Sequence, residues 1–410
     1  MNRELSEWAR EAEESLARFH GRSVEEPSSP FRPDGSRDYA RILYSRSFRR
    51  LQGKMQLLGT DHRESYRNRL THSLEVAQVS GVIAGMLGVD PLFPQACALG
   101  HDVGHPPFGH AGEAILNGLL DRYGGFEGNA QTFRILHRIE VHSGIGSGLN
   151  LTRRALLGLV KRHQPRVVDG KVNVKFMYDD DWSEVDQWWR AGALKGRIAT
   201  IDMQIMVIAD EITYGAHDLE DCLDRRSFTL DEFLDAFRAE QRPEATEILL
   251  RIVKEARERS RGAPGRQTQL VLRKQMTSRI VNTLVRNITL QKETLALQEP
   301  YGDLARGLKA TEYAVLNRGP VTLRYEQLGG MVIRGLFDVY TDHAFNRDGS
   351  LIPSEYRGVW RDDPIVGARD AIAAMMDAEA IREYEAYFGS VRDASLYEGW
   401  SRGAQGPALR

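Results

Sequence analysis

The chain has 410 residues, of which 41% are hydrophobic and 27% charged, and its formal net charge is −2. These values are typical of a folded globular protein and exclude a global positive field that would make nucleic acid the main partner. The two cysteines exclude a disulfide framework, no stretch approaches a membrane span, and the first residues lack the apolar core of a secretory signal, so we expect a cytoplasmic protein that does not contact membranes.

Apolar residues recur at helix spacing through almost the whole chain. Residues 5–19 are predicted to form an amphipathic helix, and residues 25–38 a loop rich in proline and serine. Further helices are expected over 38–58, 74–87, 112–123, 129–143, 151–163, 196–225, 228–240, 243–261, 266–295, 303–317 and 321–342. Residues 171–178 alternate apolar and polar side chains and form the one convincing strand. The pattern favours one large helical domain with C-terminal helices packed against it.

The histidines are unevenly placed along the chain. Of the 11 histidines, seven lie in one short stretch: His62, His72, His101, His105, His110, His137 and His142. A helical core does not need this density, and imidazole is the commonest neutral metal ligand. The stretch therefore suggests a metal centre.

The adjacent pair His101–Asp102 is the most informative part of that stretch. Neighbouring residues on a helix point about 100° apart, so both can touch one ion only near a helix end or in an irregular turn. Gly104 and the Pro106–Pro107 pair provide that irregularity. A mixed set of imidazole and carboxylate ligands suits Mn, Fe, Ni, Co or Mg better than structural zinc, which favours cysteine.

Three sequence blocks resemble a known family. They are RNRLTHSLEV at 67–76, LGHDVGHPPFGHAGE at 99–113 and IADEITYGAHDLED at 208–221. In this order they resemble the HD-domain superfamily, and within it the dGTPase-like deoxynucleoside triphosphate (dNTP) triphosphohydrolases. The blocks FRRLQGKMQL at 48–57, GGFEGNAQTFRIL at 124–136 and GLNLTRRALLGLVK at 148–161 are similar to the same family, so the resemblance covers roughly residues 38–221.

The resemblance implies an all-α fold, a large HD-domain helical bundle with additional C-terminal helices and at most a minor β-hairpin. It divides the chain into an N-terminal helix and loop (1–37), an HD catalytic domain (38–261) and a C-terminal helical region packed on the catalytic domain (262–410).

The same resemblance implies one divalent metal ion in each active site, held by His72, His101, Asp102 and Asp210. Asp210 matches the family's aspartate, and its neighbour Glu211 is the less suitable ligand.

The implied reaction is the hydrolysis of a dNTP, such as dGTP, to a deoxynucleoside and intact tripolyphosphate. Water attacks the α-phosphorus and O5′ leaves, so a proton must reach O5′. His110 matches the family's catalytic histidine, and Glu113, three residues further on a helix, lies beside the imidazole and orients it. Whether His110 acts as acid, base or nucleophile stays open, and the alternative for the pair is a helix-capping histidine with a surface glutamate.

Asp210, Tyr214 and Asp218 follow one another at intervals of four residues and so line one helix face. By resemblance, Tyr214 packs on the sugar and excludes a 2′-hydroxyl, and Asp218 accepts a hydrogen bond from the 3′-hydroxyl. The alternative places Tyr214 in the core and Asp218 on the surface, paired with an arginine. Gln56 and Leu57 match a segment that contacts the deoxyribose.

Other predicted substrate contacts are basic or aromatic. Arg69 lies one helical turn before the first metal ligand, where its guanidinium would clamp phosphate oxygens. Lys161 is a second phosphate ligand, or else a solvated lysine at a helix end. His105 contacts the substrate, or else it only orients His101. Where many family members have a histidine, this chain has Gly128, so one catalytic or phosphate-contacting group is missing.

Two other functions compete with this one. The first is another HD phosphohydrolase, a nucleotidase or phosphodiesterase, although the single His, His-Asp, Asp set does not favour a bimetallic phosphodiesterase. The second is a regulator that responds to nucleotides or to single-stranded DNA. The expected partners are the dNTP substrate, a dNTP or single-stranded DNA effector, and further copies of the chain in a dimer-based or hexameric homo-oligomer. The arginine-bearing helices at 251–285 could form a regulatory site between subunits.

Overall fold

Helices make up most of the computed structural model, which describes residues 31–56, 67–141, 148–190, 199–264, 267–291, 293–315 and 320–389. The predicted all-α fold is confirmed. Within those ranges the strands form two short antiparallel pairs, β1 (Val167–Val168) with β2 (Lys171–Val172) and β3 (Ile288–Gln291) with β4 (Thr294–Leu297). The helix expected over 5–19 lies outside the described residues. None of the described helices is both long and apolar enough to cross a bilayer.

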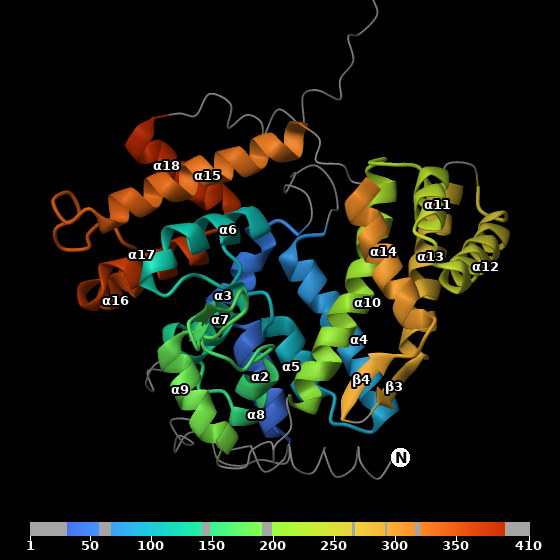
Figure 1. Cartoon of the computed structure of the whole chain (residues 1–410), viewed down its shortest axis with the longest axis horizontal. Helices are drawn as coiled ribbons and strands as arrows, with labels where there is room; N and C mark the ends of the chain where they lie inside the picture. The colour runs from blue at the N-terminus through green and yellow to red at the C-terminus, as the bar shows by residue number, and fades with distance from the viewer. Residues whose placement is uncertain are drawn as a thin grey trace, which may run out of the picture.

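Three helices occupy the centre of the molecule, α4 (Arg69–Leu87), α5 (Leu92–Gly100) and α10 (Ile201–Asp224) (Figure 1). Helix α4 begins where Asn68 and Thr71 cap each other's backbone, and it ends at Gly88, whose left-handed φ of 71° stops the helix as the sequence predicted. Around these three helices lie α2 (Asp34–Leu43), α3 (Arg46–Arg50), the 3-10 turn at Leu51–Gly53 and α8 (Arg153–Gly158).

Most of the segment between α5 and α10 lies to one side of the central helices, on their left in Figure 1. It contains α6 (Gly109–Leu119), a 3-10 turn at Asp121–Tyr123, α7 (Gly128–Arg134), a π-helical turn at Ile135–Ile139, and α9 (Asp179–Trp188).

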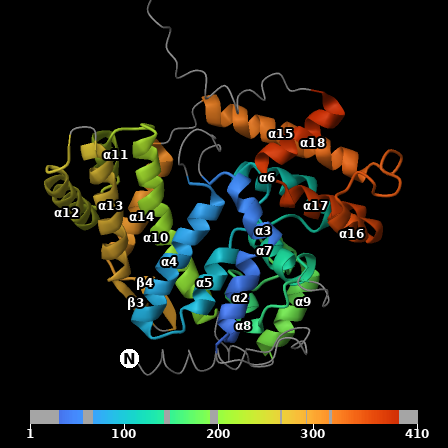
Figure 2. The same cartoon turned by 180° about the vertical axis from the view of Figure 1, so that it is seen from behind.

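Two groups of later helices flank this centre on opposite sides, as Figures 1 and 2 show. On the side of α10 lie α11 (Leu230–Ala239), α12 (Pro243–Ser260), α13 (Gln267–Val285) and α14 (Tyr301–Val315). Over α6 lie α15 (Pro320–Thr341), a 3-10 turn at Ser354–Tyr356, α16 (Arg357–Asp362), α17 (Pro364–Ala374) and α18 (Asp377–Phe388).

The buried apolar side chains divide in the same way. The larger cluster extends from Ile42 on α2 to Leu308 on α14 and includes α4, α5 and α10. The smaller cluster joins α6 to α15, α17 and α18 around Leu116, Tyr340 and Ile372. The domain boundary expected at residue 261 falls inside the larger cluster and stays a prediction.

The strand predicted over 171–178 was wrong beyond its first two residues. Val172 and Val174 are 62% and 82% exposed, so their alternation does not face a core, and the pairing stops after β2. The helix predicted over 266–295 was wrong at its end, because it stops at Val285 and is followed by the β3–β4 hairpin. In β4 burial alternates, with Leu295 and Leu297 buried, which is the period of a strand.

Close backbone contact between the turn after α5 and helix α7 generates a prediction. A Cβ on Gly104 would lie 2.1 Å from the backbone nitrogen of Thr132 and 2.2 Å from the carbonyl oxygen of Gly128, whereas a Cβ on Gly118 would meet nothing within 4 Å. Gly104→Ala should therefore lower the free energy of unfolding by about 3 kcal/mol or more. Gly118→Ala, in the last turn of α6, should change it by about 1 kcal/mol or less, in the stabilising direction. Denaturant unfolding of both variants checks this, and equal effects would contradict the close approach.

Candidate active site

The turn that follows α5 carries the central pair. Helix α5 ends at Gly100, His101 is its C-cap, and Asp102 lies in the non-helical turn that follows. The pair therefore stands at a helix end, as binding of one ion by adjacent residues requires. Thr132 of α7 holds this turn. Its hydroxyl accepts a hydrogen bond from the backbone nitrogen of Gly104 at 3.0 Å and donates one to the carbonyl oxygen of His101 at 3.1 Å. This irregular turn allows the adjacent side chains of His101 and Asp102 to face the same point.

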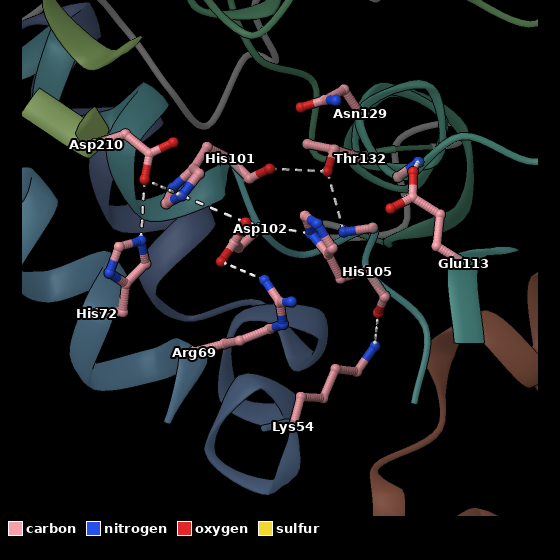
Figure 3. Close-up of polar contacts among 12 residues, drawn as sticks. Lys54, Arg69, His72, His101, Asp102, His105, Glu113, Asn129, Thr132 and Asp210 are labelled. Carbon is pink, nitrogen blue, oxygen red and sulfur yellow. Dashed lines mark hydrogen bonds and ion pairs between the residues drawn. The ribbon is translucent and has the colours of Figure 1, made fainter. Parts of the chain in front are cut away.

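Four side chains from three segments converge at that point, as Figure 3 shows. Nε2 of His72, on α4, lies 3.0 Å from Oδ1 of Asp210, on α10, and Nε2 of His101 lies 3.6 Å from the same oxygen. Nε2 of His101 also lies 3.3 Å from Oδ1 of Asp102. Ligand atoms of His72, His101 and Asp102 all lie within 4.8 Å of one another.

This cluster has the properties of a cation site. Nδ1 of His101 lies 2.6 Å from the carbonyl oxygen of Ala98, and it must donate there, which leaves Nε2 as the nitrogen that can bind a metal ion. That Nε2 is buried and has no hydrogen-bond partner among the described residues. A buried imidazole nitrogen that faces two carboxylates needs a positive charge there, either a proton or a metal ion. The residues fit a divalent ion that accepts mixed nitrogen and oxygen ligands.

Neighbouring cations keep the two carboxylates ionised. Burial alone would raise the pKa of Asp102, but His101 and Arg69, which donates to Oδ2 at 2.7 Å, outweigh burial and hold the pKa well below its usual range. Burial is likewise outweighed at Asp210, where Lys161 and His101 lower the pKa; Nζ of Lys161 lies 3.4 Å from Oδ2. Ionised carboxylates are the form that binds metal.

His110 and Glu113 meet in the first turn of α6. Nδ1 of the exposed His110 lies 3.4 Å from Oε2 of Glu113, and the backbone nitrogen of Gly128 donates to Oε1 at 3.1 Å. Burial would raise the pKa of Glu113, but the bond to His110 and the charges of His105 and Lys175 outweigh it and lower that pKa. Glu113 is therefore an ionised acceptor that can hold Nδ1–H of His110 and leave its Nε2 free.

His105 links the metal cluster to this pair. Its Nδ1 lies 3.1 Å from Oδ1 of Asp102, and its ring centroid lies 5.9 Å from that of His110. Burial and the nearby charge of Arg69 lower the pKa of His105. Figure 3 shows His105 between Asp102 and Glu113.

The face of α10 beyond Asp210 presents Tyr214 and Asp218. Asp218 is buried, and its Oδ2 makes no hydrogen bond within the described structure; the same holds for Oε1 of Gln56. Nζ of Lys309, on α14, lies 5.0 Å from the centroid of the Tyr214 ring. The predicted contact Leu57 lies outside the described residues.

Comparison with known proteins places this geometry in a family. The HD-domain family model matches residues 69–215. Deoxyguanosinetriphosphate triphosphohydrolase-like protein 2 of Vibrio cholerae serotype O1 is 41% identical over 413 residues, which cover 96% of this chain and 98% of that protein. The chain belongs to this dGTPase-like family of HD-domain proteins. The dGTPase-like protein 1 of Mesorhizobium japonicum is 32% identical over 399 residues, 92% of this chain and 94% of that protein. A third dGTPase-like protein, from Nitrobacter hamburgensis, is 42% identical over 219 residues, 53% of this chain and 54% of its own length.

Membership of this dGTPase-like family makes the chain a metal-dependent phosphohydrolase. The HD domain implies a divalent metal, and the cluster of His72, His101 and Asp102 is able to hold one. The predicted ligand Asp210 contacts both imidazoles, while its neighbour Glu211 is exposed. The individual roles predicted for these and the other site residues stay predictions.

Lys54 is a structural residue of the dGTPase-like sequence blocks that the sequence did not single out. Nζ of the fully buried Lys54 donates hydrogen bonds to the carbonyl oxygens of His105 and Ala373. Burial lowers the pKa of Lys54 to about 7. In the sequence, the one sign that Lys54 matters was its position inside the block FRRLQGKMQL. Lys54 therefore joins α17 to the segment from His101 to His110, the catalytic turn.

Asp377, at the start of α18, holds the same turn from the other end. Its buried carboxylate accepts hydrogen bonds from the backbone nitrogens of Phe108 at 3.0 Å and Met55 at 3.1 Å, and from the hydroxyl of Tyr325 at 2.9 Å. Phe108 has a left-handed φ of 65°, which a non-glycine residue adopts only where its surroundings enforce it. No local pattern links Asp377 to residues so distant in sequence.

The buried carboxyl of Asp218 predicts a pH-dependent stability. Burial raises its pKa to about 7 in the folded chain, against about 4 when unfolded. The folded state therefore binds the extra proton between these values, and wild-type stability falls as pH rises from about 4 to about 7. Asp218→Asn removes this pH-dependent contribution to the free energy of unfolding. The difference in Tm, Asp218→Asn minus wild type, should become more positive by about 2 °C or more between pH 4.5 and pH 7.5. A flat or falling difference in thermal unfolding would contradict the raised pKa.

Proposed function

We propose that this protein hydrolyses deoxynucleoside triphosphates, dGTP or other dNTPs, to deoxynucleoside and tripolyphosphate. The curated relatives that match it are named deoxyguanosinetriphosphate triphosphohydrolase-like proteins. The observation that carries the proposal is the juxtaposition of a buried His/Asp cluster with the ionised Glu113 and exposed His110, joined through His105.

In the proposed reaction water attacks the α-phosphorus, the bond from phosphorus to O5′ breaks, and O5′ takes up a proton. A divalent ion held by His72, His101, Asp102 and Asp210 would withdraw negative charge from the phosphoryl oxygens. Mn, Mg, Fe, Ni or Co would suit this ligand set. Arg69 and Lys161 support the ligands Asp102 and Asp210 from outside.

His110 is the proposed general acid/base. Its side chain is 80% exposed, so it can reach a bound substrate, while Glu113 holds Nδ1 at 3.4 Å. The ionised Glu113 favours the tautomer that presents Nε2 outward and stabilises the imidazolium. This lets His110 deliver a proton to O5′ or remove one from the attacking water.

The nucleoside end of the substrate is proposed to lie along α10. Tyr214 would pack against the sugar and exclude a 2′-hydroxyl. Asp218 and Gln56 each have a buried oxygen without a hydrogen-bond partner among the described residues, and such oxygens can accept from the 3′-hydroxyl. The proposal leaves the dNTP or single-stranded DNA effector and the homo-oligomer as predictions.

A product assay tests the proposed function. Purified protein with Mn or Mg receives each dNTP and rNTP, singly and mixed, beside Asp102→Ala. Wild type should release deoxynucleoside and tripolyphosphate from dNTPs, and Asp102→Ala should release neither, because it loses a metal ligand. Stepwise release of phosphate would favour a nucleotidase instead, and no turnover even in mixed dNTPs would favour a nucleotide-responsive regulator.

The catalytic pair is tested separately from the metal cluster. His110→Ala should lower kcat by about 10²–10⁴-fold, the usual contribution of a general acid or base. Metal content and Tm should stay at wild-type values because the side chain is exposed and lies outside the metal cluster. Tyr123→Ala, an exposed aromatic residue beyond α6, serves as the control and should retain kcat. A His110→Ala enzyme with wild-type kcat and wild-type metal content would rule out this role.

A further inference from the structure

Asp377 accepts hydrogen bonds from two segments that carry active-site candidates. Its Oδ1 accepts from the backbone nitrogen of Phe108 at 3.0 Å, and its Oδ2 accepts from the backbone nitrogen of Met55 at 3.1 Å. His110 follows Phe108 by two residues, and Gln56 follows Met55 directly. One buried carboxylate on α18 therefore ties the segment of the proposed general acid/base to the segment of a proposed sugar contact.

The start of α18 does not rely on Asp377 alone for its polar contacts. An acidic residue in the first turn of a helix usually interacts with the free N–H groups there. In α18 the carboxylate of Glu379 accepts from the backbone nitrogen of the N-cap Met376 at 3.1 Å. The bonds of Asp377 go instead to the catalytic turn, to Met55 and to the hydroxyl of Tyr325.

The backbone of Phe108 needs this support because it lies in the left-handed region. Its φ is 65°, and α6 begins at the next residue, Gly109. A residue with a Cβ keeps such a conformation only where its surroundings enforce it. The side chain of His110 is 80% exposed, so its position depends on this backbone more than on packing. The conformation of Phe108 therefore decides where the His110 imidazole lies.

The ring of Phe108 is held from a second side by α15, which lies above α6 in Figure 1. The buried ring contacts Tyr325 edge to face, with 5.4 Å between the two centroids. A Cβ on Gly329 would lie only 2.6 Å from Cγ of Phe108 and 2.8 Å from its Cβ. Glycine at position 329 thus allows α15 to approach the ring. Helix α18 holds the backbone of Phe108, and α15 holds its side chain.

We propose that Asp377 is a positioning residue for the reaction and acts through Phe108 to place His110 against the substrate. This inference rests on the proposed function, in which His110 is the general acid/base. Asp377 bonds backbone groups of the catalytic turn rather than a reacting atom, so it acts on the rate through position. A displacement of about 1 Å caused by a mutation outside the chemistry can lower a rate by about 10²-fold.

A double-mutant cycle tests this role with the dNTP that wild type hydrolyses fastest. Asp377→Asn keeps the size of the side chain but replaces one accepting oxygen by an NH₂ group, which cannot accept from a backbone N–H. It should lower kcat by about tenfold or more, with wild-type metal content. In the His110→Ala background the same substitution should lower kcat by less than about twofold, because the group that it positions is already missing.

Gly329→Ala reaches the same turn by a second route. The added methyl group pushes the Phe108 ring without changing Asp377, so kcat should fall in the wild-type background and stay within about twofold in the His110→Ala background. Gly330→Ala is the matched control on the same helix. Its Cβ would meet the flexible end of Arg334 at 3.0 Å and a methyl group of Ile115 at 3.4 Å. It should keep kcat within about twofold of wild type.

Two results would overturn the inference. One is wild-type kcat in folded Asp377→Asn, and the other is an equal loss of kcat in the wild-type and His110→Ala backgrounds, which indicates structural damage that does not pass through His110. If Asp377→Asn does not fold, as judged by thermal unfolding, the comparison of Gly329→Ala with Gly330→Ala decides in the same way. The proposed function fails by a different result, the absence of tripolyphosphate among wild-type products.

Discussion

The carboxylate of Asp102 is the group around which the active site is arranged. It is buried, with Oδ2 bonded to Arg69 and Oδ1 beside both His101 and His105. An isolated buried carboxylate would become protonated or move to solvent. Here the surrounding cation and imidazoles hold it ionised, so the negative charge stays where a divalent ion can use it. The arrangement also fixes His105 between the metal cluster and the catalytic pair.

A second constraint is that the catalytic turn lies where the two apolar clusters meet. Phe108 belongs to the smaller cluster, while Val103, five residues earlier, belongs to the larger one. Lys54 and Asp377 bridge the two clusters by bonding backbone groups of this turn. The C-terminal helices therefore hold the turn that carries His110, rather than only covering it. Buried polar bridges of this kind favour one arrangement because unpaired partners would be costly.

The sequence predicted the parts of this protein that follow local rules. Residue spacing and turn chemistry predicted helix α4, its end at Gly88, and the position of the His101–Asp102 pair at a helix end. The β3–β4 hairpin was missed because the apolar residues after Val285 also fit a helical period. Only their burial in the folded chain, which alternates along β4, distinguishes a strand from a helix there. Lys54, Asp377 and Lys175 were missed because their contacts depend on tertiary packing, which brings together residues with no common local pattern.

The route of oxygen through the reaction tests the central claim most directly. Wild-type protein with Mn or Mg would hydrolyse a dNTP in water enriched in oxygen-18, and mass spectrometry would locate the label. Attack on the α-phosphorus with departure of O5′ predicts one labelled oxygen in tripolyphosphate and none in the deoxynucleoside. Label in the deoxynucleoside would place the attack on carbon, and label in released monophosphate or pyrophosphate would show cleavage further along the chain. Either result would contradict the account of how this site acts.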